Sequence, residues 1–193
     1  MTMTREKQER LSEDIHLLGD ILGHVIRRQA GIEIFELEER IRALAKTRRV
    51  EADPAVDRRL AHVVGQLDPA EAELVARSFT TYFELVNLAE EQHRVRVLRE
   101  RERDAHPQPT PESVSDAVAT LYRAGVDEIE MRQLLDRLRI DLVFTAHPTQ
   151  AKRRTILAKL RRIAAALTDL DVRDLLPAER AALVERLTAE VTL

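Results

Sequence analysis

The sequence predicts a mainly α-helical protein with one short strand. Charged residues make up 34% of the 193 residues and hydrophobic residues 44%, which is typical of soluble, helix-rich chains. Aromatic residues are only 3% and Trp is absent, so the large side chains that favour strands are scarce. Through most of the chain, apolar residues recur at three- and four-residue spacing, which is the periodicity of an amphipathic helix.

The composition also limits the kinds of partner. The chain has no cysteine, which excludes a disulfide framework and a thiolate site. The net charge is −3 and basic residues are interleaved with acidic ones, so we expect no nucleic-acid partner. The polar start lacks the apolar centre of a signal peptide, and no run approaches the roughly 18–20 apolar residues of a membrane span. We therefore expect a cytoplasmic protein without a membrane partner.

The first part of the chain predicts two successive helices. The first covers residues 6–28, and Gly31 is expected to break the helical pattern after it. The second carries apolar residues spaced alternately by three and four, which indicates a packing seam. These seam residues are Ile34, Leu37, Ile41 and Leu44.

Two Asp-Pro pairs predict the next helix starts. Asp53 and Asp68 each stand before a proline, the order of an N-cap followed by the first helical position. Glu71 lies three residues after Asp68, so it is placed to complete a capping box. We expect the helix that follows Asp68 to extend to about residue 103.

Residues 104–111 form the clearest predicted loop of the chain. Three prolines in five residues exclude a helix there. We expect Thr110–Pro111 to cap the next helix, which ends at Gly125. Asp127 and Glu130 predict a capping box for another helix. The inward face of the helix after the loop is predicted to be Val114, Val118 and Leu121, and a last helix is predicted from about residue 177 to 190.

The central stretch of the chain is residues 141–154. Residues 142–144 are Leu-Val-Phe, which predict one buried strand, and Pro148 would stop that strand because it has no N–H to donate. From about Thr149 the apolar spacing becomes helical. His147 is therefore expected where a strand ends and a helix begins, the edge at which ligands bind in parallel α/β architectures.

Three cations are predicted in the first turn of that helix, Lys152, Arg153 and Arg154. They oppose the helix macrodipole, and a bound anion would turn this repulsion into attraction with help from free N–H groups. Together with His147 they indicate a phosphate or carboxylate site. The alternative is structural: a histidine that caps a backbone carbonyl, and basic residues that are simply solvated.

Residues 144–154 read Phe-Thr-Ala-His-Pro-Thr-Gln-Ala-Lys-Arg-Arg. This stretch resembles the first active-site signature of the phosphoenolpyruvate carboxylase family, Thr-Ala-His-Pro-Thr-(Gln/Glu) followed by paired arginines. Further segments resemble the family's amino-terminal region in the same order. They are Leu-Leu-Gly-Asp-Ile-Leu-Gly at 17–23, Ile-Arg-Ala-Leu-Ala at 41–45, and Ser-Phe-Thr-Thr-Tyr-Phe-Glu-Leu-Val-Asn-Leu-Ala-Glu-Glu-Gln-His-Arg at 78–94.

The resemblance implies a much longer protein built on a helix-rich (β/α)8 TIM-type barrel. Residues 1–139 would then be an amino-terminal helical region, and residues 140–193 the first strand–helix unit of the barrel. A lone strand with no pairing partner leaves backbone groups unsatisfied, which independently suggests an incomplete protein. We therefore expect this chain to be an amino-terminal fragment that is inactive by itself.

The resemblance also implies the chemistry and its residues. The family carboxylates phosphoenolpyruvate with bicarbonate to give oxaloacetate and phosphate, as an allosteric homotetramer that uses Mg²⁺ or Mn²⁺. His147 matches the catalytic histidine, and Arg153 and Arg154, preceded by Lys152, match a pair that binds a sugar-phosphate activator in plant-type relatives. The metal ligands are expected in parts of the family sequence that have no counterpart here. The rival hypothesis is a non-catalytic helical interaction module, which the amphipathic helices favour.

Overall fold

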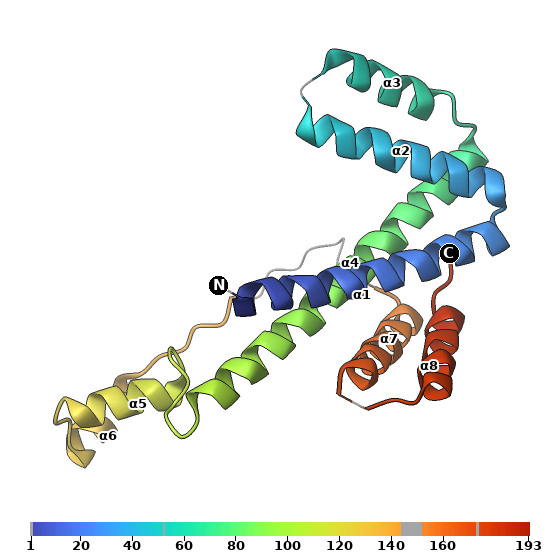
Figure 1. Cartoon of the computed structure of the whole chain (residues 1–193). Coiled ribbons are helices and arrows are strands. Elements are labelled where there is room, and N and C mark those ends of the chain that lie inside the picture. Colours follow the sequence, from blue (N-terminus) through green and yellow to red (C-terminus); the bar gives the residue numbers. More distant parts are fainter. Residues whose placement is uncertain (1, 52, 144–151, 173) are drawn as a thin grey trace. The chain divides into compact units, whose positions relative to one another are not determined.

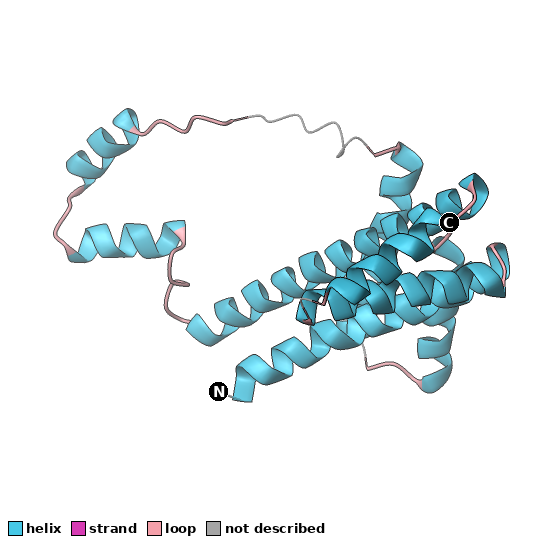
Figure 2. Cartoon of the chain, turned by 90° about the horizontal axis from the view of Figure 1, so that it is seen from above, coloured by secondary structure: helices cyan, strands magenta, loops and turns pink. Residues whose placement is uncertain are grey.

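The computed structural model describes residues 2–51, 53–143, 152–172 and 174–193. Over these ranges the chain forms eight helices joined by loops, as Figures 1 and 2 show. The prediction of a mainly helical chain is confirmed. No helix in the described ranges is long and apolar enough to cross a membrane.

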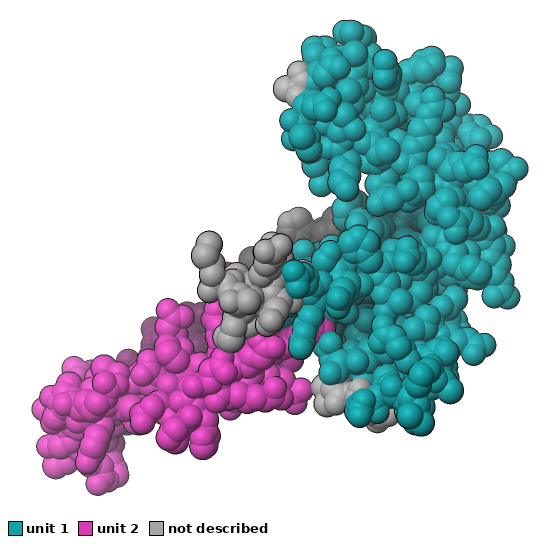
Figure 3. All heavy atoms as spheres, viewed as in Figure 1, with its two compact units in different colours: residues 1–93, 154–193 teal, residues 94–153 magenta. Residues whose placement is uncertain are grey.

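The chain divides into two compact units, which Figure 3 distinguishes by colour. The first unit comprises Met1–His93 and Arg154–Leu193, and the second comprises Arg94–Arg153. This division follows contacts within the chain and does not test the predicted boundary at 139/140, which concerns the family's complete fold and stays a prediction.

The first unit is a bundle of helices. It contains α1 (Thr2–Gln29), α2 (Ile32–Val50), α3 (Pro54–Gly65), the first part of α4 (Pro69–Ala105), α7 (Arg154–Val172) and α8 (Pro177–Glu190). Helix α1 packs against α2 and α8, while α2 and α3 form one antiparallel pair and α7 and α8 another (Figure 1).

The core of this unit joins segments that are far apart in the sequence. Leu18 and Ile26 of α1, Ala89 of α4, Leu167 of α7 and Leu187 of α8 are each at most 2% exposed and belong to one cluster. A second cluster joins α2, α3 and α4 through Ile41, Val63 and Val75. The predicted seam of α2 is therefore confirmed as a packing face.

An ion pair also joins the last two helices. The Arg162 guanidinium donates to both carboxylate oxygens of Glu190, at 2.6 and 2.8 Å. This hydrogen bonding, together with the arginine charge, holds the pKa of Glu190 below its ordinary value. The pair fixes the register of α7 against α8 at the surface, where such contacts contribute little to stability.

The helix starts follow the local signals in the sequence. Asp53 Oδ1 accepts from the backbone N–H of Ala55 at 2.8 Å, and Asp68 forms the predicted capping box with Glu71. Gly31 adopts a φ of 96°, which breaks the chain between α1 and α2 because only glycine tolerates this region without strain. These predictions are confirmed.

The second unit contains the remainder of α4, then α5 (Val114–Arg123) and α6 (Glu128–Arg137). The Asp127–Glu130 capping box and the positive φ of Gly125, at 87°, are as predicted. The predicted cap at Thr110–Pro111 is wrong, because α5 begins later and Ser113 caps it through the N–H of Asp116. Neither α5 nor α6 has a buried residue.

Two further predictions about this unit are wrong. The face of α5 is not turned inward: Val114 is 83% exposed and Val118 48%. The strand at 142–144 is absent at its two described residues, Leu142 and Val143, which are 73% and 85% exposed. Both errors have one physical reason: burial and strand pairing each need a second surface, and the described residues supply none here.

Candidate functional site

The structure describes the predicted anion site only in part. His147 lies outside the described residues, as do Phe144 and Pro148. Lys152 and Arg153 are loop residues at the end of the second unit, and Lys152 is half-buried. Arg154 is exposed and is the first residue of α7. The helix therefore begins later than predicted, and only Arg154 of the three cations lies within its first turn.

The start of α7 has no acidic side chain in its first turn. A helix N-terminus carries partial positive charge, so the Arg154 guanidinium adds to the field of the backbone there. A positively charged side chain in the first turn of a helix lowers stability by a few tenths of a kcal/mol when the site is exposed. The arrangement is compatible with an anion near Arg154, as the sequence suggested.

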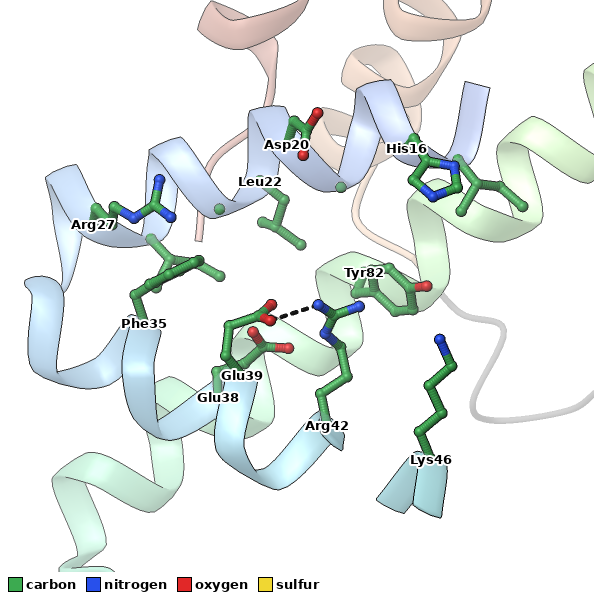
Figure 4. Close-up of a pocket in the computed structure, with 14 residues that line it drawn as sticks. His16, Asp20, Leu22, Arg27, Phe35, Glu38, Glu39, Arg42, Lys46 and Tyr82 are labelled. Carbon is green, nitrogen blue, oxygen red and sulfur yellow. Dashed lines mark hydrogen bonds and ion pairs between the residues drawn. The ribbon is translucent and has the colours of Figure 1, made fainter. Parts of the chain in front are cut away.

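The structure also contains a cavity that the sequence did not predict. It has a volume of about 560 Å³ and lies in the first unit, between α1, α2 and α4. Figure 4 shows His16, Asp20 and Arg27 on the α1 side, with Tyr82 contributed by α4. The α2 side is formed by Phe35, Glu38, Glu39, Arg42 and Lys46. All the family-like segments before residue 100 contribute to it: 17–23, 41–45 and 78–94.

Glu38 is the buried polar group of this cavity. Its residue is only 5% exposed, although glutamate is rarely buried without a partner. Burial and the neighbouring charge of Glu39 raise the pKa of Glu38 from 4.5 to about 7, while Arg42 opposes the shift. The Glu38 carboxyl is therefore close to half-protonated at neutral pH, so it can either donate or accept a hydrogen bond.

Only some of the other charged side chains that line the cavity have a partner. Arg42 donates to Glu39 Oε2 at 2.5 Å, and the Arg27 guanidinium lies 3.7 Å from the centre of the Phe35 ring. The His16 Nδ1 atom lies 2.5 Å from the backbone oxygen of Ser12.

Small residues keep the cavity open. Gly19 and Gly23 line it from α1, one helical turn apart. A Cβ atom at Gly23 would lie 3.1 Å from the Phe35 ring, so glycine allows this ring to approach α1 closely. A Cβ atom at Gly19 would meet nothing within 4 Å, which leaves open space beside that helix.

Sequence reasoning missed Glu38, although one signal for it was present. Glu38 stands four residues after Ile34 and three before Ile41, so it shares the buried face of α2. A charged residue at a core position of a helix is a reason to look for a special environment. The approach of Phe35 to Gly23 and Arg27 has no such signal, because it depends on how two helices pack.

No metal site is present in the described ranges: they hold no group of three or more His, Cys, Asp or Glu side chains arranged to bind an ion. The resemblance places the Mg²⁺ or Mn²⁺ ligands in parts of the family sequence without a counterpart here, so no chemical step is assigned to a metal held by the described residues.

Comparison with known proteins gives the family. A family model described as phosphoenolpyruvate carboxylase matches residues 11–193. The phosphoenolpyruvate carboxylase of Roseiflexus castenholzii is 45% identical over 165 residues, which cover 86% of this chain and 18% of that protein. Its counterpart in Ectopseudomonas mendocina is 44% identical over 183 residues, covering 94% of this chain and 20% of that protein.

These matches define the class of protein. They extend over nearly all of this chain, and they include the helical regions as well as the signature at 144–154. The chain belongs to the phosphoenolpyruvate carboxylase family. It spans about a fifth of the length of these relatives, 18% and 20% respectively.

Proposed function

We propose that this chain is part of an enzyme that carboxylates phosphoenolpyruvate with bicarbonate, giving oxaloacetate and phosphate. The observation that carries the proposal is the signature at 144–154 within a chain of this family. The proposal includes Mg²⁺ or Mn²⁺ as the cofactor, a homotetramer as the assembly, allosteric control and a cytoplasmic location. The relatives' names support the reaction, and the other features are expectations from the family resemblance.

In the proposed reaction, an oxygen of bicarbonate attacks the phosphorus of phosphoenolpyruvate. The bond from phosphorus to the enol oxygen breaks, which leaves carboxyphosphate and the enolate of pyruvate. His147 accepts the carboxyphosphate proton, since a histidine exchanges protons near neutral pH. Carboxyphosphate then divides into CO₂ and phosphate, and the enolate carbon attacks CO₂ to form oxaloacetate. Because every species is anionic, cationic groups are needed to hold them together.

A chimera tests this proposal. This chain replaces the matching segment of the Roseiflexus castenholzii relative, and oxaloacetate is measured by coupling its reduction to NADH oxidation. We expect the chimera to form oxaloacetate, and this chain alone to form none. A folded chimera that makes no oxaloacetate, beside an active parent enzyme, would contradict the proposal.

The role of His147 is tested in the same chimera. His147→Asn is expected to abolish oxaloacetate formation but to leave some bicarbonate-dependent phosphate release, since phosphoryl transfer precedes the proton transfer. His106→Asn is the matched control, because His106 also precedes a proline but has an exposed side chain in a loop. Full oxaloacetate formation by His147→Asn would remove His147 from the mechanism.

Arg153 and Arg154, with Lys152 before them, are proposed to bind a sugar-phosphate activator. Guanidinium groups bind phosphate through paired hydrogen bonds, which explains the residue type. In the chimera, replacing both arginines with alanine should reduce activation by glucose 6-phosphate more than the basal rate. Arg58 and Arg59 of α3 are both exposed, so replacing them with alanine is the control that removes the same charge elsewhere. Equal loss of activation and basal rate would instead place the pair in catalysis or folding.

The second candidate function is a non-catalytic helical interaction module. The exposed apolar residues of α5 and α6 favour it, since Ile129 is 68% exposed and Leu135 57%. An inactive but folded chimera would support this function over the carboxylase.

A further inference from the structure

The cavity between α1, α2 and α4 has a charge pattern that points to a ligand of a particular class. Its lining carries Asp20, Glu38 and Glu39 as acids, and Arg27, Arg42 and Lys46 as bases. Only one ion pair joins them, between Arg42 and Glu39. Over the described residues, Asp20 and Lys46 form no ion pair, so the cavity presents unpaired charges of both signs.

The two signs are separated along α2. Glu38 is buried at 5% exposure, whereas Arg42 and Lys46 are exposed and follow it by one and two helical turns. Four residues rise about 6 Å along the helix axis. Figure 4 shows Arg42 and Lys46 projecting from α2 toward the same side of the cavity as Tyr82. Arg42 uses one N–H group for Glu39, which leaves further donors of its guanidinium for another acceptor.

We propose that this cavity binds a small zwitterion, with its ammonium group at Glu38 and its acidic group at Arg42 and Lys46. A simple anion would leave the buried Glu38 carboxylate with only Glu39 as its hydrogen-bond partner and without a cationic group, and a simple cation would be repelled by the bases at the rim. A molecule with both charges satisfies each end of the cavity. The raised pKa of Glu38 agrees with this, because an arriving ammonium group would stabilise its ionised form.

The volume and lining of the cavity suit such a ligand. About 560 Å³ is within the range of small-molecule sites. Ile15 of α1 and Phe35 of α2 are half-buried and supply apolar surface against which methylene groups can pack. Gly19 adds open space on the same helix. The inference needs no carboxylase activity, so it can be tested on this chain independently of the proposed function.

Three probes with five carbon atoms each test the charge requirement. They are 5-aminopentanoate, pentanoate and pentylamine, which carry both charges, the acid alone and the amine alone. Four methylenes place the two charges of 5-aminopentanoate about one helical turn apart. Isothermal titration of this chain should show saturable binding of 5-aminopentanoate, at least about tenfold tighter than either single-charge probe. No saturation, or equal affinity for pentanoate or pentylamine, would overturn the proposal.

Substitutions then locate the binding site. Gly19→Leu should fill the cavity and abolish binding, whereas Gly65→Leu should not, because Gly65 is helical, has open space and lies outside the cavity. Glu38→Gln should weaken binding about tenfold by removing the partner of the ammonium group. Circular dichroism establishes that each variant keeps its helical content. Unchanged binding in folded Gly19→Leu would place the ligand elsewhere and overturn the proposal.

Two substitutions that each remove one positive charge test the predicted contact with the ligand's acidic group. Lys46→Gln should weaken binding of 5-aminopentanoate several-fold, while Arg40→Gln should not, because Arg40 is exposed on the same helix but does not line the cavity. Equal losses in both variants would show that general charge, and not this site, holds the probe.

Discussion

The two units of this chain are built from similar helices but differ in burial. In the first unit, α1, α4, α7 and α8 bury apolar side chains in a shared cluster, with Leu187 at 0% exposure. In the second unit, α5 and α6 are capped by Ser113 and Asp127 and yet contain no buried residue. The comparison teaches that local signals suffice to start and stop a helix, whereas a core requires several apolar faces that meet.

The largest difference is expected for loss of a leucine side chain. Leu18→Ala in the first unit should lower the free energy of unfolding by roughly 2–5 kcal/mol, because Leu18 is 1% exposed and its removal leaves a cavity. Leu135→Ala in the second unit should change it by less than about 0.5 kcal/mol, since Leu135 is 57% exposed. Urea denaturation followed by circular dichroism measures both. Similar losses of unfolding free energy in the two variants would show that the two units do not differ in burial.

Glu38 provides a pH-dependent contrast within the first unit. Its pKa is about 7 in the folded chain against an ordinary value of 4.5, so the folded state binds more protons between these values and loses stability as pH rises from 4.5 to 7. The penalty at pH 8 is of the order of 3 kcal/mol at most. Glu38→Gln should therefore stabilise the chain at pH 8 but not at pH 4.

Thermal unfolding across this pH range tests the Glu38 prediction. Glu36→Gln is the control, because Glu36 is exposed on the same helix. If wild type and Glu38→Gln have parallel profiles from pH 4 to pH 8, the carboxyl does not titrate as stated.

The capping boxes sharpen the comparison further. Asp68 and Asp127 each accept a hydrogen bond of 2.8 Å from the N–H group three residues on. Asp68→Ala should cost about 1 kcal/mol of global stability, because α4 belongs to the core. Asp127→Ala should loosen α6 locally and leave the main unfolding transition unchanged. An equal shift of the denaturation midpoint in both variants would contradict this.

The smallest expected effect concerns glycine. Gly19→Ala should stabilise the first unit by about 0.5–1 kcal/mol, since Gly19 is inside α1 and an added Cβ meets nothing within 4 Å. Gly125→Ala should instead weaken the end of α5, because Gly125 has a φ of 87° that other residues rarely adopt. The melting temperature measures the effect of Gly19→Ala, and amide exchange of α5 measures the effect of Gly125→Ala. Destabilisation by Gly19→Ala would show that the space beside it is filled.

The predictable features of this chain were those encoded within a few residues. Asp53, Asp68 and Asp127 identified helix starts correctly because a cap and its N–H partner lie within three residues of each other. The seam of α2 was also predicted, because one face of a helix is periodic in sequence. The beginning of α7 was misplaced by several residues, since its first residue carries no capping signal.

Features that depend on distant segments were not predictable. The strand at 142–144 and the inward face of α5 both require a second surface, which a local pattern cannot supply. The cavity depends on α1, α2 and α4 packing together, so its residues look ordinary in sequence apart from Glu38 on an apolar face. The role of His147 remains a prediction from the signature, because that residue lies outside the described ranges.

Residue-resolved amide hydrogen exchange tests the contrast between the units most directly. We predict that amides of α7, α8 and the centre of α1 exchange only through openings close to global unfolding. Amides of α5 and α6 should exchange at least about a hundredfold faster, because local openings of helices without buried residues require little free energy. Protection of α5 and α6 equal to that of α7 and α8 would contradict the account, since it would mean that the second unit has a core of its own.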